Sequence, residues 1–117
     1  MHVDDLADAS IFALDNWDPN KNDAPLDESG QPLNWLNVGT GIDLRIKELA
    51  EMIADITSFK GDIIWNENKP DGTFRKLLNV SKLEKLGWKS KIPLKEGLII
   101  TYKDYKKELK DNKLRIK

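Results

Sequence analysis

Extended segments are scarce in this chain of 117 residues. Only residues 35–38, 63–65 and 74–80 have the short length and the composition of strands. Two or three strands of this length are too few for a sheet that is stable by itself. The pattern therefore predicts an α/β chain with two or three short strands that forms an incomplete domain.

Helical spacing of apolar residues marks much of the remaining sequence and predicts about four helices. They cover roughly 3–15, 43–54, 81–86 and 93–109. In the last of these the apolar residues recur every three or four positions, while lysines fill the opposite face. Each helix is therefore expected to bury one side only.

Capping residues mark the starts of the first three helices. Asp4 or Asp5 is expected to cap the first helix, and Asp43 is the nearest candidate for the second. Ser81, with Glu84 three residues later, has the pattern of a capping box for the third.

Two further segments lie outside these elements. Residues 18–34 contain three prolines, a glycine and many Asn and Asp residues, which predicts an exposed loop. Residues 103–117 carry seven bases and three acids, a net charge of +4. Lysines suit the C-terminal end of a helix, so 111–117 is interpreted as a frayed basic tail rather than a nucleic-acid contact.

Composition excludes several function classes. The net charge of −1 gives no general attraction for nucleic acid, and no apolar run approaches the length of a membrane span. Cysteine is absent, which removes thiolate catalysis and fits a cytoplasmic protein. The single histidine, His2, rules out a His-rich metal site, and no serine lies in a nucleophile-elbow context. Neither a catalytic nor a metal-binding residue is expected.

Two loops have the composition of anion-binding segments. Gly39-Thr40-Gly41 resembles a phosphate loop only in part, because Leu44 replaces the third glycine, so no cofactor site is expected there. Arg75 and Lys76 follow a Pro-Asp-Gly turn, and adjacent residues on an extended segment project to opposite faces. One cation can then enter a pocket and bind phosphate. A plain surface turn explains the same residues.

The order of segments resembles a known family. Residues 2–9, 37–41 and 46–50 resemble the His-Val-Asp-Asp-Leu-Ala-Asp-Ala, Asn-Val-Gly-Thr-Gly and Ile-Arg-Glu-Leu-Ala stretches of extended short-chain dehydrogenases acting on nucleotide sugars. Residues 69–83 are similar to the Lys-Pro-Asp-Gly-Thr-Pro-Arg-Lys-Leu-Leu-Asp-Val-Ser-Arg-Leu segment of the GDP-L-fucose synthase family. The resemblance runs from His2 to about Tyr105, which is most of the chain.

The resemblance implies a fold and an activity. That family epimerises GDP-4-keto-6-deoxy-D-mannose at C3 and C5 and reduces C4 with NADPH, which gives GDP-L-fucose. Its members join a Rossmann domain to a C-terminal substrate domain, and residues 1–117 would be the substrate-binding region, with the Rossmann core missing. The dinucleotide loop, the Tyr-x-x-x-Lys motif and the Cys/His pair of the family are not in this chain. NADP(H) is therefore expected only in the full-length family, which is a homodimer, and the chain alone is expected to be inactive.

The resemblance also assigns substrate contacts. Lys76, ahead of Arg75, is implied to contact the diphosphate of a GDP-sugar, and Asp71 is implied to shape the loop or bind a sugar or ribose hydroxyl. The partner would be the missing Rossmann domain, in cis or in trans. Two alternatives stay open: a fragment of another nucleotide-sugar epimerase or dehydratase, and a non-catalytic nucleotide-sugar-binding or interaction module. Phe74 and Asn79 depart from the family's Pro and Asp.

Overall fold

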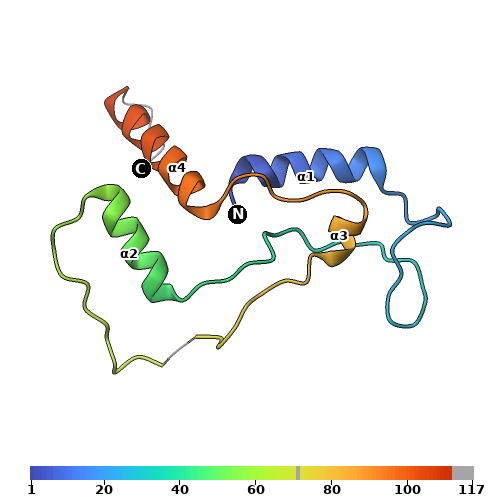
Figure 1. Cartoon of the computed structure of the whole chain (residues 1–117), viewed down its shortest axis with the longest axis horizontal. Coiled ribbons are helices and arrows are strands. Elements are labelled where there is room, and N and C mark those ends of the chain that lie inside the picture. Colours follow the sequence, from blue (N-terminus) through green and yellow to red (C-terminus); the bar gives the residue numbers. More distant parts are fainter. Residues whose placement is uncertain (71, 112–117) are drawn as a thin grey trace. The chain divides into compact units, whose positions relative to one another are not determined.

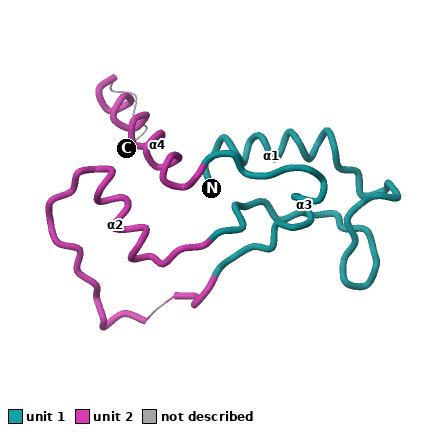
Figure 2. Tube along the Cα trace, viewed as in Figure 1, with its two compact units in different colours: residues 1–42, 76–92 teal, residues 43–75, 93–117 magenta. Residues whose placement is uncertain are grey.

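The computed structural model describes residues 1–70 and 72–111. The chain consists of two compact units, one formed by residues 1–42 and 76–92 and the other by 43–75 and 93–117 (Figure 2). Four helices are the regular elements of the described part: α1 (Val3–Asn16), α2 (Ile46–Thr57), α3 (Ser81–Lys85) and α4 (Leu94–Lys110) (Figure 1). The predicted number and approximate positions of the helices are confirmed.

The first unit has a small core between α1 and α3. Ala9, Leu83 and Trp88 are its buried residues, and Phe12, Leu36 and Val38 pack against them in part. Gly87 follows α3 with a φ of +110°, a conformation that suits glycine after a helix. This turn directs the chain so that Trp88 packs back on the helix that precedes it, with 4% of its surface exposed.

Two aspartates of α1 hold the segment that follows this core. Asp5 is 2% exposed, and its two carboxylate oxygens accept the backbone N–H groups of Lys91 and Ile92 at 3.1 and 3.0 Å. One oxygen of Asp8 accepts the Trp88 indole N–H at 2.8 Å and the Lys91 ammonium at 2.9 Å. Both hydrogen bonds lower the pKa of Asp8, and the one from Lys91 contributes most. The first unit is therefore closed by carboxylates as well as by apolar contacts.

The capping predictions are wrong for three helices. His2 caps α1, since its Nδ1 accepts the Asp4 N–H at 3.3 Å while Asp5 points into the core. Arg45 is the N-cap of α2, and Glu48 accepts its N–H at 2.7 Å, so Asp43 lies outside the helix. The N-cap of α3 is Val80, because Ser81 is already its first residue.

The second unit contains the packing of α2 against α4. The two helices enclose an apolar pocket of about 280 Å³, lined by Ile53, Ile56, Thr57, Leu98, Thr101, Tyr102 and Tyr105. Lys106 extends its ammonium over the Tyr102 ring, 4.4 Å from the centroid. Pro93 is the N-cap of α4, which confirms the predicted start of this helix.

The two or three predicted strands are not formed in the described residues. The only β pairing there is a single antiparallel bridge between Leu26 and Pro32. A strand needs a neighbour for its backbone N–H and C=O groups, and 35–38, 63–65 and 74–80 have none. The described chain by itself is therefore helical with long irregular connections, and the predicted strands are not confirmed.

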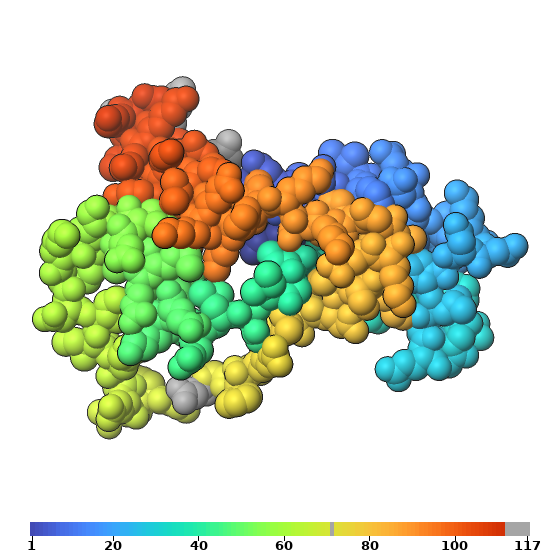
Figure 3. Space-filling view, in the orientation of Figure 1, coloured from blue at the N-terminus to red at the C-terminus, as the bar shows by residue number. Residues whose placement is uncertain are grey.

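Large apolar side chains of these irregular connections are open to solvent. Ile64 is 88% exposed, Trp65 is 47% exposed and Phe74 is fully exposed. Figure 3 shows the segment around residue 64, in yellow-green, at the molecular surface. Contiguous exposed apolar patches are typical of surfaces that contact another chain or domain.

No helix of the described residues has the length and apolarity that crossing a membrane requires. The predicted basic tail at 111–117 lies outside the described residues except for Asp111.

Candidate functional site

Arg75 is held by a carboxylate. Its Nε lies 2.7 Å from Asp43 Oδ2, and its Nη2 lies 3.4 Å from Asp43 Oδ1, so both donors lie on one edge of the guanidinium. The Arg75 hydrogen bond lowers the pKa of Asp43 and raises that of Arg75 in return. Both side chains keep contact with solvent, at 62% exposure for Arg75 and 38% for Asp43.

Lys76 differs from its neighbour. It is exposed and makes no ion pair or hydrogen bond with a described residue. The boundary between the two compact units falls between Arg75 and Lys76. Asp71, the third residue implied for substrate contact, lies outside the described residues. Of the three implied contacts, the structure thus describes one fixed cation and one unpaired cation.

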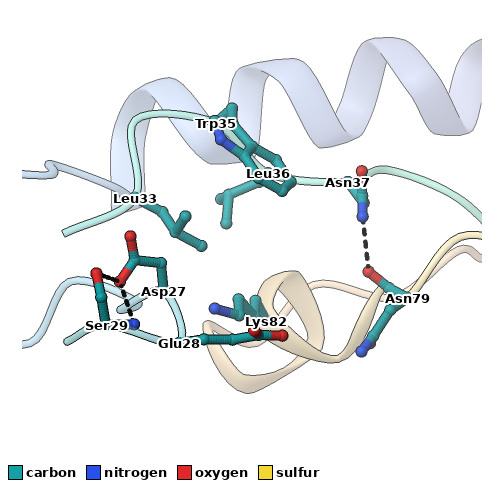
Figure 4. Close-up of a pocket in the computed structure, with 9 residues that line it drawn as sticks. All are labelled: Asp27, Glu28, Ser29, Leu33, Trp35, Leu36, Asn37, Asn79 and Lys82. Carbon is teal, nitrogen blue, oxygen red and sulfur yellow. Dashed lines mark hydrogen bonds between the residues drawn. The ribbon is translucent and has the colours of Figure 1, made fainter. Parts of the chain in front are cut away.

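A separate pocket lies in the first unit, between the 18–34 loop and α3 (Figure 4). It has a volume of about 450 Å³, and its lining residues are Asp27, Glu28, Ser29, Leu33, Trp35, Leu36, Asn37, Asn79 and Lys82. Neither Arg75 nor Lys76 lines it.

Several polar groups that line this pocket already make hydrogen bonds within the protein. One oxygen of Asp27 accepts hydrogen bonds from the Ser29 N–H, the Ser29 hydroxyl and the Gln31 N–H at 2.8–2.9 Å. These hydrogen bonds lower the pKa of Asp27, and the one from the Gln31 N–H contributes most. The Lys82 ammonium donates to the carbonyl oxygen of Leu26, and the Asn37 amide donates to the carbonyl oxygen of Asn79 at 3.2 Å. We interpret the pocket as part of the architecture of the 18–34 loop.

Asp43 is the site residue that sequence reasoning missed. It was expected to cap α2, and it pairs instead with a residue 32 positions later in the chain. Neither periodicity nor spacing predicts a contact of this separation. The Asp27 turn was also missed, although an Asp with Ser and Gly two and three residues later has the pattern of an Asx turn.

No family model matches the chain. Individual proteins do match it. Over 105 residues, which is 90% of the chain, it is 49% identical to a protein of Oryza sativa subsp. japonica named probable GDP-L-fucose synthase 1. The chain belongs to the GDP-L-fucose synthase family. It spans 28% of the length of that relative, and the matched stretch is the C-terminal part. The resemblance identified from the sequence is confirmed.

Solved structures of GDP-sugar reductases extend the comparison. A GDP-6-OMe-4-keto-L-xylo-heptose reductase from C. jejuni superposes with a TM-score of 0.80 at 41% identity, over 92% of this chain and 30% of that one. A GDP-mannoheptose C4 reductase from Campylobacter jejuni, with NADP bound, gives a TM-score of 0.72 at 39% identity, over 91% of this chain and 30% of that one. The fold of the family is therefore that of the short-chain dehydrogenase-type nucleotide-sugar reductases.

Proposed function

We propose that the chain is the substrate-binding part of an enzyme that converts GDP-4-keto-6-deoxy-D-mannose to GDP-L-fucose. The observation that carries the proposal is the 49% identity to the rice relative over 90% of the chain. In this proposal NADPH and the catalytic groups are held by the part of the family's length that the chain does not span, in the same polypeptide or in a second one. The working enzyme is then a cytoplasmic homodimer.

The role proposed for this chain is recognition of the diphosphate. Lys76 is exposed and has no partner within 1–70 and 72–111, which suits a direct contact with a phosphate oxygen. Arg75 offers further N–H donors on the edge that Asp43 leaves open. Asp71 is the proposed contact for a sugar or ribose hydroxyl. The charge of the cations would stabilise bound substrate, whereas the redox and proton-transfer chemistry belongs to the remainder of the enzyme.

A second candidate is reduction of another GDP-sugar. It is favoured by the 0.80 TM-score and 41% identity to the GDP-heptose reductase of C. jejuni. The identity to the rice relative is higher, at 49%. We therefore place the fucose synthase activity first.

A chimera tests the proposal. The matched C-terminal stretch of the rice relative is replaced by this chain, and NADPH oxidation is followed with GDP-4-keto-6-deoxy-D-mannose. Turnover within about tenfold of the rice parent is expected, because a matched substrate surface should preserve most transition-state contacts. The control is the rice parent truncated before the replaced stretch.

A folded chimera that binds NADPH and shows no more turnover than the truncated control would refute the proposal. Turnover of a GDP-heptose ketosugar in place of the deoxymannose substrate would favour the second candidate.

A further inference from the structure

We infer that Asp43 is a positioning residue that sets the guanidinium of Arg75 for contact with the diphosphate of the substrate. The inference rests on the proposed function, and it adds a residue that neither the sequence pattern nor the resemblance assigns. Its basis is the pair of contacts from Asp43 to Nε and Nη2 of Arg75, at 2.7 and 3.4 Å.

The donor geometry of Arg75 supports this role. A guanidinium has five N–H donors in one rigid plane and has no acceptor. Asp43 engages the Nε–H and one N–H of Nη2. One N–H of Nη1 and the second N–H of Nη2 form the adjacent, terminal edge, a fork that matches two phosphate oxygens. When Asp43 holds one edge of the Arg75 guanidinium, the direction of its terminal N–H groups is fixed as well.

The backbone around Asp43 makes it a suitable anchor. Asp43 lies two residues before Arg45, the N-cap of α2. Glu48 fixes that helix start by accepting the Arg45 N–H at 2.7 Å. The carboxylate of Asp43 thus stands beside an ordered helix terminus, whereas Arg75 comes from a long irregular segment. The contact with Asp43 gives the Arg75 side chain a fixed direction, which lowers the ordering cost of ligand binding.

The direction in which anion affinity changes when Asp43 is removed distinguishes a positioning role from a purely electrostatic one. If Asp43 acted only as a nearby negative charge, its removal would strengthen the binding of an anion. If Asp43 orients Arg75, its removal weakens that binding, even though the local charge becomes more positive.

The test measures GDP affinity and steady-state kinetics of the chimera with Asp43→Asn. Asn keeps the size of the side chain and loses the charge that holds the guanidinium. We expect about a tenfold higher Kd for GDP and a higher KM for the GDP-sugar, because a hydrogen bond to a charged group contributes at this level. The turnover number should change little. Asp43→Glu should restore part of the affinity.

Two controls make the outcome decisive. Asp62→Asn removes the same charge from an exposed residue of the same unit and should leave the affinity unchanged or slightly tighter. In an Arg75→Ala background, Asp43→Asn should have no further effect, because the group that it positions is gone.

Unchanged or tighter GDP binding by the Asp43→Asn chimera would overturn the inference and leave the proposed function intact. A parent chimera that binds no GDP would contradict both. An equal loss of affinity with and without Arg75 would assign Asp43 to a general structural role instead.

Discussion

Replacing Lys76 with alanine in the chimera is expected to weaken GDP-sugar binding roughly 10- to 150-fold. This corresponds to about 1.5–3 kcal/mol, the usual contribution of a hydrogen bond to a charged group. Lys76 is exposed and has no partner among the described residues, so its truncation removes no structural contact. The loss should therefore appear in substrate affinity and not in the free energy of unfolding.

Isothermal titration with GDP, together with a thermal melt of the same protein, measures both quantities. Lys60→Ala is the matched control, since Lys60 is an exposed lysine in the other unit. An unchanged GDP affinity in Lys76→Ala would remove this residue from the site. Equal losses in the two variants would indicate a non-specific effect of charge.

Replacing Asp5 with alanine should destabilise the first unit by about 2–4 kcal/mol, because it leaves two backbone N–H groups without their acceptor. Asp5 is 2% exposed, and it accepts the N–H groups of Lys91 and Ile92. Because Asp5 is buried, water does not easily take over as acceptor for these two N–H groups. The segment that carries Trp88 and Lys91 should then open more often.

Hydrogen exchange of the peptide covering 88–92, measured by mass spectrometry on the chimera, reports this local opening. Exchange should accelerate strongly in Asp5→Ala and stay near the parent rate in Asp4→Ala, whose side chain is 75% exposed. Equal exchange in the two variants would show that Asp5 does not hold the segment.

The sequence was informative where structure depends on local pattern. The four helices follow the apolar spacing, and Pro93 caps α4 at its expected start. Family membership also followed from contiguous segments, above all 69–83, and the rice relative confirms it.

The sequence was uninformative where structure depends on distant partners. The segment 63–65 has the composition of a strand, but it finds no neighbour in the described chain. Asp5 and Asp43 are of a residue type that often caps helices, yet each accepts a hydrogen bond from a segment much later in the chain. An aspartate near a helix start can either cap the helix or bind a distant segment. Tertiary contacts decide between these two roles, and local propensity does not encode them.

The exposed apolar residues connect the fold to the proposed function. Ile64 is 88% exposed and Phe74 is fully exposed, while the core of the first unit contains only a few buried residues. The chain spans 28% of the rice relative, so the family has a much larger structure against which such residues can pack. The central claim is that this chain forms one part of that larger fold and depends on contacts with the rest of it.

The stability of the isolated chain tests this claim most directly. Light scattering after size exclusion, at several concentrations, gives its association state, and circular dichroism during heating gives the sharpness of unfolding. We expect self-association, or a broad transition at low temperature, because the buried apolar area is small and the exposed apolar area is large. A monodisperse monomer with one sharp unfolding transition would contradict the claim.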